Sequence, residues 1–119
     1  TKYFDCPLFI THWPKEIKAF YMKHLEDGTV AGADLELPGI GEVFGMSQRE
    51  DDYDTLLKEM KDRKMKIEDY SWYLKLRKYA GVESSGFGIG FERLLMYITG
   101  IENIKDVIAY PRSVSNCEF

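Results

Sequence analysis

The sequence has little of what marks membrane, secreted or nucleic-acid-binding proteins. No apolar run approaches the roughly 20 residues that a membrane helix needs, and no segment resembles a signal peptide. The only two cysteines, Cys6 and Cys117, lie near opposite ends without metal-ligand spacing, which indicates reduced thiols in a cytoplasmic protein. The net charge of -4 provides no general basic field, so any contact with nucleic acid must be local or involve residues outside this chain.

What is present is typical of a folded domain. The 119 residues allow one compact domain, and a hydrophobic fraction of 45% lies far from the range of disordered chains. Residues 1–50 are predicted to be β-rich, with a strand in "PLFITHW" and a further strand in "GEVFGMSQRE". Between them, "AFYMKHLEDGTVAGADLEL" is predicted to form two strands around a hairpin turn at Asp27-Gly28. Helices are predicted over 51–64, 69–81 and 92–100, followed by a last helical turn in "NIKDV". Strands followed by helices predict the α+β class, with an antiparallel sheet flanked by helices.

The stretch "GFGIGFER", residues 86–93, places glycines at every second position. Along a strand, Gly86, Gly88 and Gly90 share one face, which therefore carries no side chains. Such a face suits close packing of the backbone or a flat ligand such as a nucleobase, and the spacing favours neither. Arg93 follows at a strand-to-helix junction, where it can clamp phosphate oxygens or simply pair with Glu92.

A second stretch, "GADLELPGIGEVFGMSQRE", carries the other candidate residues. Asp34 and Glu42 lie on neighbouring predicted strands, where they can hold Mg²⁺ together with nucleotide phosphates or form a solvated polar face. Val30, Ala33, Leu35 and Leu37 are expected to face roughly one way, and Asp34 and Glu36 the other. Arg49 can recognise a carboxylate or amide oxygen if a bulge near Gly45-Met46 shifts the strand phase, and otherwise forms a salt bridge at the strand end.

Hydrolase chemistry is not supported by the remaining polar residues. His12 and His24 have no partners at metal-site spacing, and no serine lies in a G-x-S-x-G elbow. The aromatic run "YSWYLKLRKY" fits a helix core and rim better than a stacking platform for nucleic acid. Its basic residues Lys75, Arg77 and Lys78 can still contact a phosphate backbone.

Several separated motifs together resemble a known family. "GFGIGFERLLMYITGIENIKDVIAYPR" is similar to motif 3 and the C-terminal tail of class II aminoacyl-tRNA synthetases, in the subgroup that charges Asp, Asn and Lys. "THWPKEIKAFYMK", "LELPGIGEVFGMSQRE", "RKYAGV" and "PRSVSNCEF" look most like the asparagine-charging members, particularly the bacterial ones. The resemblance covers essentially the whole chain. It implies that residues 1–119 are the C-terminal portion of a catalytic domain, without motifs 1 and 2 and without the anticodon-binding domain.

The resemblance implies roles for nine residues. Glu42 and Asp34 match acids that hold ATP-bound magnesium, while Arg49 and Ser47 match amino-acid-binding positions. The ATP-binding residues of motif 3 match Gly88, Gly90, Phe91, Glu92 and Arg93, with Glu42 and Arg93 implied to be catalytic. Two departures from the family pattern are Met46, where a glycine is usual, and Glu83-Ser84, where Pro-His is usual.

The implied reaction activates asparagine with ATP and Mg²⁺ and transfers it to tRNA, in an enzyme that is a homodimer. Catalysis by positioning and charge requires no protein nucleophile. The isolated fragment is predicted to be inactive. Alternatives that stay open are an aspartate-charging enzyme, a synthetase-like enzyme that makes asparagine from aspartate, and a non-catalytic binding module.

Overall fold

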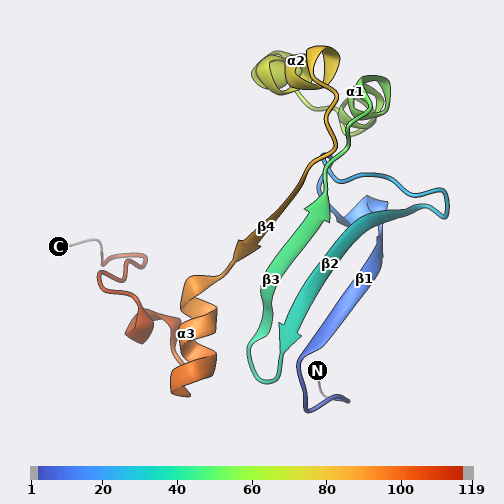
Figure 1. Cartoon of the computed structure of the whole chain (residues 1–119). Coiled ribbons are helices and arrows are strands. Elements are labelled where there is room, and N and C mark those ends of the chain that lie inside the picture. The colour runs from blue at the N-terminus through green and yellow to red at the C-terminus, as the bar shows by residue number, and fades with distance from the viewer. Residues whose placement is uncertain (1–2, 117–119) are drawn as a thin grey trace. The chain divides into compact units, whose positions relative to one another are not determined.

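Four strands form one antiparallel sheet in the order β1-β2-β3-β4 in the computed structural model, which describes residues 3–116 (Figure 1). The strands are β1 (Leu8–Pro14), β2 (Thr29–Leu37), β3 (Gly41–Gln48) and β4 (Ser85–Ile89). The α-helices are α1 (Tyr53–Asp62), α2 (Ser71–Tyr79) and α3 (Phe91–Thr99). Short 3₁₀ helices are η1 (Lys15–Ile17), η2 (Ile67–Tyr70) and η3 (Ile104–Val107). The predicted α+β class is confirmed.

Packing divides the chain into two compact units, which are described separately below. Unit 1 contains the segment that ends at Phe9, Asp34–Gly45, and the segment that begins at Gly88. Unit 2 contains Ile10–Ala33 and Met46–Phe87. The bounds fall inside the strands, so β2 and β3 contribute residues to both units.

In unit 2, the turn at Asp27-Gly28 forms as predicted. The backbone N–H and the hydroxyl of Thr29 donate to Asp27 Oδ1 at 2.9 and 2.6 Å, and Gly28 adopts the left-handed conformation with φ of +82°. The segment before the turn is not the predicted strand, however, because its bridges go to two different partners. Met22 pairs with Arg49, and His24 pairs with Val30.

The helices of unit 2 enclose its hydrophobic core. Helix α1 begins after Asp52, whose carboxylate accepts a hydrogen bond from Thr55 N at 2.7 Å and so satisfies a free N–H of the first turn. Helix α2 begins at Ser71 rather than near Asp69, because η2 precedes it. The buried core residues are Leu56, Met60 and Leu74.

In unit 1, α3 is the helix predicted after the glycine stretch. It begins after Gly90 and ends at Gly100, which has a left-handed φ of +72° and donates its N–H to Met96 O at 2.8 Å. No helix within residues 3–116 is long and apolar enough to cross a bilayer.

The predicted faces of β2 need one correction. Val30 and Asp34 were expected on opposite faces, yet their exposed fractions are 1% and 3%, so both are buried. Side chains four residues apart share a face of a regular strand, which explains the common burial. Asp34 therefore does not belong to a solvated polar face.

Candidate active site

The two predicted metal-binding acids converge on one glycine of unit 1. A Cβ added to Gly45 would lie 3.2 Å from Glu42 Oε1 and 3.4 Å from Asp34 Oδ1. The carboxylates come from the neighbouring strands β2 and β3, and a side chain at position 45 would press closely against Glu42. Asp34 is buried, whereas Glu42 is exposed to solvent.

Paired carboxylates of this kind fit a magnesium ion that is shared with a nucleotide. Mg²⁺ is usually bound by one or two carboxylates, with the remaining ligands supplied by substrate phosphates and water. Residues 3–116 contain no group of three or more His, Cys, Asp or Glu side chains that could hold a metal alone. Asp34 and Glu42 therefore suit a metal that arrives with its phosphates better than a permanent metal centre.

Arg93 lies at the start of α3 and is connected to the same acidic strand. Its Nη1 donates to the backbone carbonyl of Glu42 at 2.5 Å, and its Cδ lies 3.4 Å from where a Cβ of Gly90 would be. The Gly90 N–H in turn donates to Val43 O at 2.8 Å. These contacts hold an exposed guanidinium next to the Glu42 backbone, where it can reach phosphate oxygens.

The other motif 3 residues surround this junction. Gly88 has no atom within 4 Å of the position that a Cβ would take, so its face of β4 is open. Phe91 is exposed and Glu92 partly buried in the first turn of α3, where an acid is favourable to the helix dipole. The open backbone at Gly88 can accept a flat ligand.

Unit 2 contains the two predicted amino-acid-binding residues. Arg49 Nη1 donates a hydrogen bond to the hydroxyl of Ser47, and the guanidinium carbon lies 4.7 Å from the ring centroid of Tyr21. Ser47 and Arg49 are two residues apart and thus share a face, which places Met46 on the opposite one. Val43 and Ser47 are both buried, as regular alternation requires, so this burial pattern gives no sign of the expected bulge.

The glycines of the stretch 86–90 were interpreted as permitting either close packing or the binding of a flat ligand, and Gly86 supports close packing. A Cβ at Gly86 would lie 2.7 Å from Arg49 Nη2, closer than atoms can pack, so this glycine accommodates the guanidinium. Gly88 in contrast faces open space. Of the three alternating glycines, Gly86 and Gly90 therefore permit close packing of arginine side chains, and Gly88 remains open.

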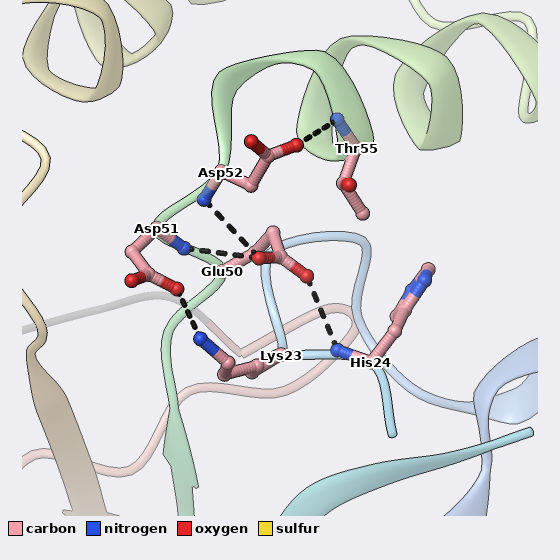
Figure 2. A network of polar contacts seen from close by, with 6 residues as sticks. All are labelled: Lys23, His24, Glu50, Asp51, Asp52 and Thr55. Carbon is pink, nitrogen blue, oxygen red and sulfur yellow. Dashed lines mark hydrogen bonds and ion pairs between the residues drawn. The ribbon is translucent and has the colours of Figure 1, made fainter. Parts of the chain in front are cut away.

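A buried carboxylate next to Arg49 organises the chain around it (Figure 2). Glu50 Oε2 accepts from His24 N at 3.2 Å, and Glu50 Oε1 accepts from the N–H groups of Asp51 and Asp52 at 3.1 and 3.2 Å. Lys23 donates to Asp51, and this hydrogen bond raises the pKa of Lys23 and lowers that of Asp51. The network connects the segment before β2 to the segment after β3.

Sequence reasoning missed Tyr21, Gly45, Gly86 as an arginine contact, and Glu50. No local pattern marks Tyr21 or Glu50, because Tyr21 contacts Arg49 and Glu50 contacts His24, each pair being 26 or more residues apart in the sequence. Gly45 carried a weak signal, since glycine in a strand indicates close approach of other atoms.

The fold and these contacts define a class of protein. Two carboxylates and an exposed arginine in unit 1 suit a nucleotide with its metal, while a braced arginine in unit 2 suits a carboxylate or amide. Such residue types suit an enzyme or binding protein for a nucleotide and a small polar substrate.

Comparisons with known proteins identify the family. The family model described as "tRNA synthetases class II (D, K and N)" matches residues 1–114. The chain belongs to this family. It is 57% identical over 117 residues to an asparagine--tRNA ligase of Bacillus cytotoxicus, and 55% identical over 119 residues to that of Acholeplasma laidlawii.

Solved structures agree with this assignment. The chain is similar to an asparaginyl-tRNA synthetase of Pyrococcus horikoshii complexed with asparaginyl-adenylate, with a TM-score of 0.91 and 42% identity over 98% of this chain. The corresponding Entamoeba histolytica enzyme gives a TM-score of 0.90 and 38% identity over 96% of this chain. The matches span 27% of each of those chains, and the chain spans 25% of the Bacillus cytotoxicus ligase.

Proposed function

We propose that this chain is the C-terminal part of the catalytic domain of an asparagine–tRNA ligase. The observation that carries the proposal is 57% identity to such a ligase over 98% of the chain. The pair of carboxylates around Gly45 and the braced Arg49 fit part of the chemistry that this activity needs. The full-length enzyme would convert asparagine and ATP to the adenylate and then charge tRNA.

Unit 1 carries the nucleotide in this proposal. Arg93 contacts phosphate oxygens of ATP from the start of α3, while the open backbone at Gly88 supports the adenosine and Gly90 accommodates the Arg93 side chain. Phe91 and Glu92 complete the nucleotide site in the first turn of the same helix. Asp34 and Glu42 would hold the Mg²⁺ ion, which when bound neutralises phosphate charge and orients the triphosphate.

Unit 2 carries the amino acid. The Arg49 guanidinium donates hydrogen bonds to the side-chain oxygen of asparagine, and Ser47 and Tyr21 hold it in one orientation. An oxygen of the asparagine carboxylate attacks the α-phosphorus of ATP, and the bond to pyrophosphate breaks. The residues act by orientation and charge stabilisation, so no protein nucleophile is needed.

Asparagine is favoured over aspartate as the substrate by the pattern of similarity. Identity is 42% and 38% to two asparaginyl-tRNA synthetases of known structure, but 25% to a putative aspartyl-tRNA synthetase of Leishmania major. The remaining partners are tRNA and a second copy of the full-length enzyme, in the cytoplasm where proteins are synthesised.

A graft tests the proposal. We define the grafted enzyme as the Bacillus cytotoxicus ligase in which this chain replaces the matching 117 residues. It is expected to catalyse asparagine-dependent exchange between ATP and pyrophosphate and to charge tRNA with asparagine, whereas the ligase with those residues deleted is inactive. Exchange with aspartate alone would indicate an aspartate-specific enzyme, and no exchange with a folded graft would favour a non-catalytic module.

The isolated chain provides a separate test of its proposed place in the enzyme. Because the α-phosphate-binding arginine of motif 2 is expected outside these residues, the 119-residue chain should not charge tRNA by itself. Full charging activity from the isolated chain would contradict the proposal that it is only part of the catalytic domain.

A further inference from the structure

Glu50 is a buried carboxylate that the proposed reaction does not use. Its exposed fraction is 5%. It follows directly after Arg49, the proposed amino-acid-binding residue. A buried charge is costly unless hydrogen bonds compensate for lost solvation. The hydrogen bonds that Glu50 accepts come from backbone N–H groups of two segments that are distant from each other in sequence.

These bonds join the segment 21–24 to the segment 48–52. One oxygen of Glu50 accepts from His24, and the other accepts from Asp51 and Asp52 (Figure 2). Backbone bonds reinforce the junction, since Glu50 N donates to Tyr21 O at 2.8 Å and Lys23 N donates to Gln48 O at 3.0 Å. The carboxylate thus fixes where the first segment lies against the second.

Each segment contributes one partner to the arginine contact. Tyr21 belongs to the first segment and Arg49 to the second, and the guanidinium carbon is 4.7 Å from the ring centroid. A guanidinium over an aromatic face is held electrostatically, and its plane is oriented by the ring. The direction of the Arg49 donors therefore depends on the register between the two segments.

We propose that Glu50 is a positioning residue for asparagine binding, which acts by holding the Tyr21 ring against the Arg49 guanidinium. The inference rests on the proposed function of Arg49. Glu50 itself contacts no substrate in this proposal, because its carboxylate is already occupied by backbone donors.

Glu50→Gln in the grafted enzyme is the primary test. Glutamine has nearly the same shape, but its NH₂ group replaces one of the two carboxylate oxygens. That NH₂ group would then face a backbone N–H, and two donors cannot form a hydrogen bond with each other. Since a buried unsatisfied group is costly, the KM for asparagine is expected to rise about tenfold. The KM for ATP should stay within about twofold, because unit 1 carries the nucleotide.

Asp51→Asn is the matched control, because it makes the same chemical change one residue away. Asp51 contacts the Lys23 ammonium through a partly exposed pair, and such pairs contribute little. The KM for asparagine should change less than about twofold in this variant. An equal rise in both variants would overturn the assignment to Glu50.

A double-variant cycle tests whether Glu50 acts through Tyr21. Tyr21→Leu alone should raise the KM for asparagine, and adding Glu50→Gln should then raise it little further, since coupled residues are not additive. If the two single-variant increases in the KM for asparagine multiply in the double variant, Glu50 does not act through Tyr21. Equal loss of asparagine and ATP binding in Glu50→Gln would instead reveal a merely structural role.

Failure of the inference differs from failure of the proposed function. If the unmodified graft does not activate asparagine, the proposed function fails before Glu50 is tested. If it does, but Glu50→Gln leaves the KM for asparagine unchanged, only the positioning role is wrong.

Discussion

The two units hold their candidate residues in different ways. In unit 1, Glu42 and Arg93 are exposed. The carboxylates of Glu42 and Asp34 both lie near the position that a Cβ of residue 45 would take. In unit 2, Arg49 contacts the Ser47 hydroxyl, the Tyr21 ring and the bare backbone of Gly86. One arrangement is open, and the other is already braced.

The difference fits the chemistry proposed for each unit. A triphosphate brings its own charge and its metal, so Glu42 and Arg93 can remain solvated until it binds. An uncharged amide offers only weak dipoles, and recognising it requires donors with a fixed direction. Contacts that fix the direction of an arginine are therefore most useful where the ligand itself carries no charge to orient it.

Removing the braced arginine is expected to have the largest effect. Arg49→Ala in the grafted enzyme should lower kcat/KM for asparagine about a thousandfold, because truncating a hydrogen-bonded charge at a binding site is costly. Arg49→Lys should recover little of this, since lysine lacks the planar fork. Pyrophosphate exchange at varied asparagine and varied ATP measures both constants, and an equal loss for ATP would contradict the separation between the units.

Removing an acid of unit 1 should have a smaller effect that depends on the metal. Glu42→Gln is expected to lower exchange about a hundredfold at limiting Mg²⁺, with partial recovery as Mg²⁺ is raised. Glu36→Gln on β2 is the control and should change the rate less than about twofold. If extra Mg²⁺ restores nothing to Glu42→Gln, Glu42 does not act through the metal.

The same glycine-to-alanine change in each unit sharpens the comparison. In Gly86→Ala the new Cβ would meet the Arg49 guanidinium at 2.7 Å, so the KM for asparagine should rise about tenfold. In Gly45→Ala it would meet the carboxylates at 3.2 and 3.4 Å, and the Mg²⁺ requirement should rise about threefold. Each variant controls for the other, and identical changes in asparagine and Mg²⁺ dependence would contradict the assignment of two separate roles.

The smallest expected effect concerns acid and the start of α1. Hydrogen bonds from the Thr55 hydroxyl and backbone N–H lower the pKa of Asp52 in the folded state. A lowered pKa stabilises the fold above the unfolded-state value of about 3.9, and this contribution is lost as pH falls through the folded-state value.

Hydrogen exchange of residues 51–62 in the grafted enzyme measures this contribution. Asp52→Asn retains a good helix cap but does not titrate. As the pH is lowered from about 5 to about 3, protection of these residues from hydrogen exchange should therefore decrease more in the wild type than in the variant. A constant ratio over that interval would show that the carboxylate charge is not involved.

Local patterns predicted the elements more completely than the site. Helices α1 and α3 follow from their apolar spacing and from the residues that begin and end them, namely Asp52 and Gly100. The burial of Asp34 escaped prediction because it depends on β3, whose Gly45 leaves space for the carboxylate. The segment 21–24 was wrongly predicted as a strand, since its bridges are split between Val30 in β2 and Arg49 directly after β3.

The sequence by itself determined the α+β class, the strand-to-helix junction near Arg93, and the motifs that belong to one synthetase family. These features depend on residues that are close together in the chain. Only the tertiary structure decided that Gly86 packs on Arg49, that Gly45 separates two acids, and that Glu50 joins two segments. Those contacts arise between strands and loops that pair across the sheet, and periodicity along one strand carries no information about the atoms opposite.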